Sequence, residues 1–107
     1  MEIENHIFKE SKYFKSPNFN DRPNSSDIRL LVIHCISLPP NNYGGDYVKD
    51  FFLNKLQSSE HEYFESIKNL KVSSHLFINR AGEVLQFVPF DKRAWHAGES
   101  SFKGELN

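Results

Sequence analysis

The chain has 107 residues, of which 38% are hydrophobic and 25% charged, so it is long enough for one soluble domain at most. Its formal net charge of −1 gives no electrostatic reason to expect nucleic acid or an acidic membrane surface as a partner. The single cysteine, Cys35, excludes an intrachain disulfide and suits a reducing compartment. Residues 1–16 lack the apolar core of a signal peptide and no run is long enough to span a membrane, so we expect a cytoplasmic protein.

The first predicted element is a strand that follows an irregular lead-in. Residues 1–28 form this lead-in, since Ser16 to Asp27 is dense in Pro, Asn, Ser and Asp. Arg29 to Ser37 (RLLVIHCIS) is then a nearly continuous apolar run that ends before Pro39. Its length and composition predict a strand covered on both faces, in the middle of a sheet with helices packed over it.

Two helices and a hairpin are expected next. Asp46 is predicted to cap a helix that ends near Gln57, and Glu60 to Asn69 predicts a second, shorter helix. Val72 to Val88 predicts a β-hairpin whose turn holds Gly82, which supplies the positive φ of a tight turn. No element is predicted in the tail, residues 99–107. This order predicts an α/β or α+β fold around one mixed central β-sheet flanked by helices.

His34 is the first candidate for chemistry. At the C-terminal end of a central strand it lies where ligand sites of such sheets form, and neutral imidazole is a common zinc ligand. The alternative is a core histidine satisfied by backbone groups. Cys35 points to the opposite face and is interpreted as a small buried hydrophobe. His75, at the start of the hairpin, either approaches the same site or forms hydrogen bonds beside the core.

The segment from Trp95 to Gly98 is the second candidate. Trp95 offers a flat apolar face for a sugar ring, His96 offers a donor or acceptor, and the small Ala97 and Gly98 let a ligand approach the backbone. The alternative is a loop anchored by a buried tryptophan. Lys71 lies beside the hairpin and offers a cation to a carboxylate or phosphate.

Several stretches carry a family resemblance, from about Ser16 to Asn107. They are LVIHCISLPP at 31–40, YGG at 43–45, VSSH at 72–75, RAGE at 80–83 and QFVPFDKRAWHAG at 86–98. The chain resembles the AmpD-type amidases, which are zinc N-acetylmuramoyl-L-alanine amidases related to phage amidases and peptidoglycan recognition proteins. The resemblance implies a mixed sheet with one zinc ion. It also implies hydrolysis of the amide between 1,6-anhydro-N-acetylmuramic acid and L-alanine during cell-wall recycling.

The resemblance also assigns roles to residues of this chain. His34 would be a zinc ligand, and an anhydromuropeptide would bind at Lys71, Trp95, His96, Ala97 and Gly98. Cys35 departs from the family pattern, which has asparagine there. The family's general base, its other zinc ligands and a nearby lysine would follow Asn107, so no catalytic residue is expected within this chain.

We therefore expect residues 1–107 to be a single incomplete amidase domain, with the lead-in to about residue 28 and the strand, helices, hairpin and groove loop over 29–107. The chain is expected to be a truncated and inactive fragment, because one imidazole cannot hold zinc tightly. It is also expected to fold poorly, because the strand Leu30 to Ile36 would lack neighbours. The alternative is a non-catalytic module that binds peptidoglycan or muropeptides.

Overall fold

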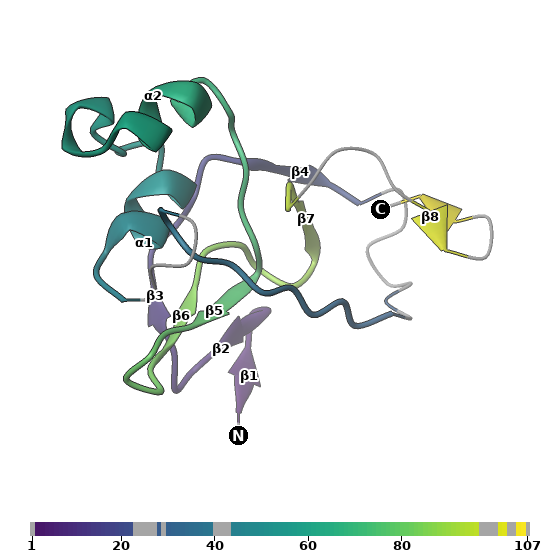
Figure 1. The fold of residues 1–107 in the computed structure, drawn as a ribbon. Helices are drawn as coiled ribbons and strands as arrows, with labels where there is room; N and C mark the ends of the chain where they lie inside the picture. Colours follow the sequence, from purple (N-terminus) through teal and green to yellow (C-terminus); the bar gives the residue numbers. More distant parts are fainter. Residues whose placement is uncertain are drawn as a thin grey trace.

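The computed structural model describes residues 2–22, 28, 30–39 and 44–96, together with the backbone of 101–102 and 105–106. Figure 1 shows two helices at one end of a group of short strands. Within this described part, no helix has the length and apolarity of a membrane span. The elements in chain order are β1 (Ile3–Glu4), β2 (Ile7–Phe8), β3 (Lys12–Tyr13), β4 (Phe19–Asp21), α1 (Tyr47–Phe52), the 3-10 turn η1 (Ser58–Glu60), α2 (Glu62–Ile67), β5 (Leu76–Ile78), β6 (Val84–Gln86), β7 (Lys92–Ala94), β8 (Ser101–Phe102) and β9 (Glu105–Leu106).

The described strands form small sheets and not the single central sheet that the sequence predicts. The largest has the order β3-β6-β5, in which β6 runs parallel to β3 and antiparallel to β5. The pairs β1-β2, β4-β7 and β8-β9 are antiparallel. The mixed α/β class is confirmed, but the lead-in contributes four strands where irregular chain is expected, and the tail contributes two.

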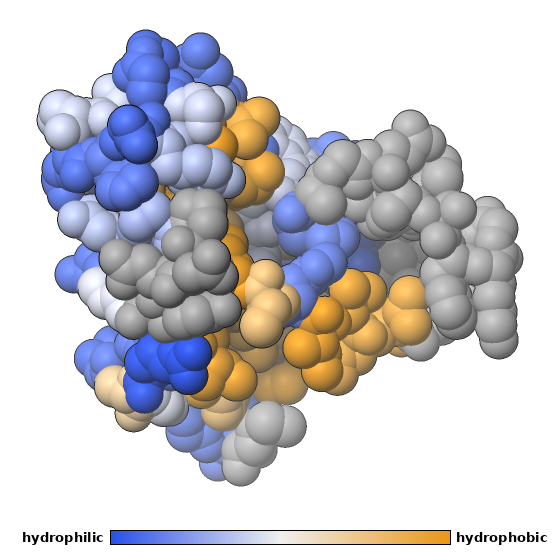
Figure 2. All heavy atoms as spheres, viewed as in Figure 1, coloured by the Kyte–Doolittle hydropathy of each residue, from blue (hydrophilic) through white to orange (hydrophobic). Residues whose placement is uncertain are grey.

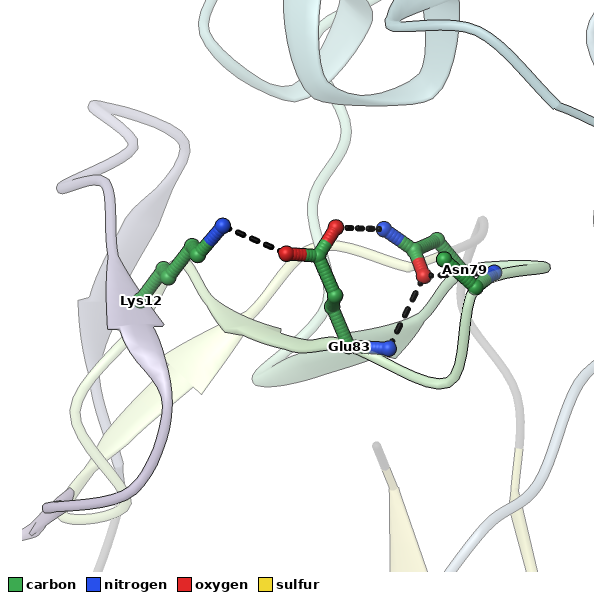
Figure 3. A network of polar contacts seen from close by, with 4 residues as sticks. Lys12, Asn79 and Glu83 are labelled. Atoms are coloured by element: carbon green, nitrogen blue, oxygen red, sulfur yellow. Dashed lines mark hydrogen bonds and ion pairs between the residues drawn. The ribbon is translucent and has the colours of Figure 1, made fainter.

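The predicted hairpin is confirmed. In β5 and β6, Leu76 lies opposite Gln86, and Gly82 in the turn has a φ of 81°. The Asn79 side-chain oxygen accepts the backbone N–H of Ala81 at 3.0 Å and of Glu83 at 2.9 Å, which closes the turn. Figure 3 shows how the Glu83 carboxylate also joins Asn79 to Lys12 of β3, so the hairpin is tied to the lead-in.

Both predicted helices form, but they are shorter than expected. The α1 helix ends at Phe52, and Asn54 adopts a φ of 60°, which a helix cannot continue. The capping role predicted for Asp46 is wrong in detail, because its side chain makes no capping hydrogen bond. The α2 helix is capped by the side chain of His61, which accepts the N–H of Tyr63.

The apolar faces of the helices pack onto β6 and the residues after it. Phe52 and Phe64 are buried against Phe87 and Val88, and the rings of Phe52 and Phe87 meet edge to face at 5.1 Å. With Phe51, these phenylalanines are the largest side chains among the buried hydrophobic residues of the described core. They explain part of the chain's high aromatic content without any ligand.

A buried polar cluster joins the lead-in to this core. Ser16 and Asn18 are at most 1% exposed. Asn18 Nδ2 donates to Asn54 Oδ1 at 2.8 Å and to the Val72 carbonyl at 2.9 Å, and Asn18 Oδ1 accepts from Asn54 Nδ2 at 3.0 Å. The Ser16 hydroxyl donates to the carbonyl of Phe52, the last residue of α1. Burial costs these groups little because each has a partner.

The strand predicted between residues 29 and 37 is not formed by the described residues. Residues 30–36 belong to no strand, and Leu31 and Ile33 are 83% and 84% exposed. The prediction that this strand is covered on both faces is therefore wrong here, and so is the burial of Cys35, which is exposed. The physical reason is that a central strand needs two neighbours, and no described strand lies beside this one.

The buried Asn18 amide predicts a large mutational cost. Asn18→Ala leaves the Val72 carbonyl and the Asn54 side chain without a partner, so we expect the free energy of unfolding to fall by about 1–3 kcal/mol. Urea unfolding followed by circular dichroism measures this, with the exposed Asn69→Ala as the matched control. Equal transition midpoints for the two variants would contradict the role given to Asn18.

Candidate functional site

Two of the predicted site residues, His34 and His96, lie side by side. Their ring centroids are 4.5 Å apart with the planes tilted by 41°. His34 comes from the exposed apolar residues 30–36, and His96 comes from the chain that follows β7. The structure thus brings together side chains that the sequence places in separate segments. The sequence predicts His34 at the end of a central strand. In the structure, His34 is exposed and belongs to no described strand.

Trp95 and His96 are positioned by a reciprocal pair of hydrogen bonds at the end of β7. The backbone N–H of Trp95 donates to Ser73 Oγ at 3.1 Å, and the N–H of Ser73 donates to the Trp95 carbonyl at 2.9 Å. Ser73 is completely buried, and its hydroxyl donates to the carbonyl of Asn18 at 2.6 Å. The candidate site is therefore fixed to the buried polar cluster of the lead-in.

The indole ring of Trp95 has a further partner. Its Nε1–H donates to Asn20 Oδ1 at 3.1 Å, and the same oxygen accepts from Arg93 Nε at 2.9 Å. The half-buried indole is therefore held by one edge and is not fully buried. Sequence reasoning missed Asn20, because an asparagine in a turn-rich segment gives no sign of a partner far along the chain.

The environment of His96 favours its neutral form. Partial burial lowers the pKa of His96 below its ordinary value, and the neighbouring His34 lowers it further. A neutral imidazole keeps one donor and one acceptor nitrogen, so His96 is suited to hydrogen bonding with a polar ligand near neutral pH.

His75 is occupied elsewhere. Its Nε2 lies 2.8 Å from the Lys92 carbonyl and 3.3 Å from Arg22 Nη2. Burial is the main cause that lowers the pKa of His75, and the Arg22 charge adds to it. Of the two interpretations of His75, the structure favours hydrogen bonding beside the core.

The remaining predicted residues are not brought into the pair. Lys71 is exposed, ahead of the buried Ser73. Ala97 and Gly98 lie outside the described residues. The two imidazoles are donors of the kind that zinc accepts. However, the described residues contain no group of three or more His, Cys, Asp or Glu side chains able to hold a metal. The donor type therefore fits zinc, while the described donor set is incomplete.

Comparison with known proteins decides the family. The profile described as N-acetylmuramoyl-L-alanine amidase (Amidase_2) matches residues 24–107, which is most of the chain. The chain belongs to this amidase family. It is 50% identical over 103 residues to the 1,6-anhydro-N-acetylmuramyl-L-alanine amidase AmpD of Haemophilus influenzae, covering 96% of this chain and 56% of that protein. The AmpD of Citrobacter freundii is 46% identical over 95 residues, covering 89% of this chain and 51% of that protein.

Solved structures of the Amidase_2 family agree with the fold. The crystal structure of a Se-Met AmpD derivative superposes with a TM-score of 0.93 at 42% identity and covers 99% of this chain and 59% of that one. The solution structure of Citrobacter freundii AmpD gives a TM-score of 0.60 at 42% identity, with coverage of 100% and 57%. The resemblance seen in the sequence is therefore confirmed. The chain spans about half the length of the curated amidases that it matches.

The bond from Asn20 to the indole predicts a fluorescence change, which can be read directly because Trp95 is the only tryptophan. Asn20→Ala removes the acceptor, so we expect the indole to become more accessible and acrylamide quenching to increase. Asn20→Asp keeps an acceptor oxygen at this position and serves as the control, with quenching close to that of the wild type. Equal quenching in all three proteins would contradict the positioning of Trp95 by Asn20.

Proposed function

We propose that this chain contributes one zinc ligand and part of the substrate groove to an amidase that cleaves the bond between (anhydro)muramic acid and L-alanine in muropeptide recycling. The observation that carries the proposal is the contact between His34 and His96, with ring centroids 4.5 Å apart. His34, whose imidazole is a suitable zinc ligand, thus lies beside the segment that resembles the family's substrate groove. Membership of the amidase family supports the reaction class.

The proposed domain is incomplete within this chain. Residues 1–28 serve as its lead-in, and residues 29–107 supply the strand, helices, hairpin and groove loop. The relatives continue well beyond the matched region, since the match covers 56% of the Haemophilus influenzae protein. We therefore assign no general base to the described residues and propose that this chain alone does not turn over substrate.

Each site residue has a distinct proposed role. When bound, zinc would lower the pKa of its water and polarise the amide carbonyl. His34 would supply one neutral nitrogen ligand. Trp95, held at its indole edge by Asn20, would stack on the sugar ring, and the neutral imidazole of His96 would exchange a hydrogen bond with the muropeptide.

Two further features complete the proposed groove. Lys71 is exposed and would attract a carboxylate of the peptide. Ala97 and Gly98 would let the ligand approach the backbone, because neither carries a side chain beyond Cβ. The compartment that suits this substrate and the lone cysteine is the cytoplasm.

A second candidate function is a binding module without catalysis. It is favoured by the incomplete set of metal donors among the described residues, combined with a Trp95–His96 segment that is fixed to the buried core. In this alternative the groove binds muropeptides and zinc plays no part.

Calorimetric titration with an anhydromuropeptide tests the groove. We expect the wild-type chain to bind, and Trp95→Ala to weaken binding by about tenfold, which corresponds to ~1.4 kcal/mol. Trp95→Phe, which keeps an aromatic face, is expected to lose less. Binding that is unaffected by Trp95→Ala would contradict the groove, and zinc-dependent release of peptide by the chain alone would contradict its proposed inactivity. Zinc-independent binding would favour the binding module.

A further inference from the structure

The strand pair β4 and β7 carries the candidate groove. Asn20 of β4 lies opposite Arg93 of β7, and Trp95 and His96 follow β7 directly. Residues 30–36 approach His96 but belong to no described strand and give no comparable support, and Figure 2 shows the apolar surface that they contribute. The contacts that fix β4 against β7 therefore also fix the groove.

Arg22 and His75 join the chain at the end of this strand pair. Arg22 follows β4 directly, and its Nε–H donates to the carbonyl of Phe90, just before β7, at 3.1 Å. His75 Nε2 lies 2.8 Å from the Lys92 carbonyl oxygen and 3.3 Å from Arg22 Nη2. The rings of His75 and Phe90 also meet, with centroids 6.1 Å apart. Two side chains from distant parts of the sequence thus meet on the segment that leads into the groove.

The chemistry of these contacts sets the protonation of His75. A backbone carbonyl oxygen only accepts hydrogen bonds, so the Nε2 that approaches the Lys92 carbonyl carries the hydrogen. In the neutral ring, Nδ1 then keeps the lone pair. A guanidinium only donates and stays charged, so a proton added at Nδ1 places a second positive charge beside Arg22. The arrangement therefore suits a neutral imidazole.

Burial and charge both oppose the protonation of His75. Burial is the largest cause that lowers its pKa, the hydrogen bond to the Lys92 carbonyl opposes this, and the charges of Arg22 and His96 add to the lowering. These two groups face the ring from the chain after β4 and from the chain after β7. Lys92 Nζ lies 2.7 Å from Asp21 Oδ1, so this neighbouring pair adds little net charge.

We propose that Arg22 and His75 are positioning residues of the groove: neutral His75 lets Arg22 hold β4 against β7, whereas charged His75 repels Arg22 and loosens Trp95. The path from Arg22 to the indole is short, because Asn20 lies on the same strand and accepts the Trp95 Nε1–H at 3.1 Å. The proposal rests on the proposed function only where it calls this surface a muropeptide groove. Neither residue is assigned to contact the substrate.

The direction of the pH dependence follows from the lowered pKa of His75. In the unfolded chain this histidine has the ordinary pKa of about 6.5. The stability that neutral His75 contributes is fully present above that pH, and it is lost as the pH falls through the lower pKa of the folded state. We therefore expect the groove to be fixed at neutral pH and loosened in mild acid.

Acrylamide quenching of Trp95 in the full chain tests the proposal, with EDTA present and no substrate. The range is about pH 8 to about pH 5, where histidine is the side chain that ordinarily titrates. For the wild type we expect the quenching constant to rise as the pH falls, with a midpoint below about 6.5.

Two variants assign this rise. His75→Gln offers an amide N–H to the Lys92 carbonyl and cannot be charged, so the rise is expected to be lost. Arg22→Gln keeps a donor for the Phe90 carbonyl but lacks the charge that His75 repels, so most of the rise is expected to be lost as well. Circular dichroism at neutral pH checks that both variants fold.

His96 provides the matched control, because it adjoins Trp95 and its pKa is also lowered, by burial and by His34. His96→Gln is expected to keep the rise, with an equal or slightly higher midpoint because one charge near His75 is removed. This variant separates the effect of His75 from direct quenching of the indole by its neighbour.

The contrary results are distinct. Quenching that does not change with pH in the wild type, or a rise that survives either His75→Gln or Arg22→Gln, would overturn the proposal. A rise that disappears in His96→Gln would assign the response to His96 and would also overturn it. Failure to bind an anhydromuropeptide at any pH would instead overturn the proposed function and leave the quenching result unaffected.

Discussion

The buried polar cluster formed by Ser16, Asn18 and Ser73 is the constraint on which the rest of the structure depends. Asn18 links the lead-in to the end of α1 and to the chain before β5, and Ser73 carries the connection on to the backbone of Trp95. Among the described residues every buried side-chain donor or acceptor has a partner. Such a cluster specifies one arrangement, because any alternative packing would leave several polar groups buried and unpaired. The candidate groove therefore depends on a lead-in that has no catalytic residue of its own.

The sequence predicts those parts of the fold whose causes are local. The hairpin follows from Gly82 and Asn79 within the turn, and both helices follow from their apolar spacing. The lead-in strands could not be predicted, because β3 and β4 pair with β6 and β7 from the other end of the chain. The same limit applies to the site. His34 and Trp95 stand out by residue type and by family resemblance, whereas Asn20 and Ser73 act through partners that only the folded chain reveals.

In the apolar segment, residues 30–36, the composition of the sequence and the observed structure disagree. Its composition is that of a central strand, yet Leu31 and Ile33 are exposed because no described strand lies beside them. His34 belongs to the same segment, so the candidate metal ligand lies on an exposed and extended part of the chain. Covering the segment would desolvate His34 and reduce its freedom of movement, and both effects favour a defined coordination geometry.

Zinc affinity, measured by competition with a chromogenic chelator, tests the proposed role of His34 most directly. The account predicts that the chain alone binds zinc weakly. It also predicts that His34→Ala weakens this binding further. Structural zinc sites need about four ligands and catalytic sites about three from the protein, so one histidine is not enough. Tight, stoichiometric zinc binding by this chain alone, or binding that is unaffected by His34→Ala, would contradict the account.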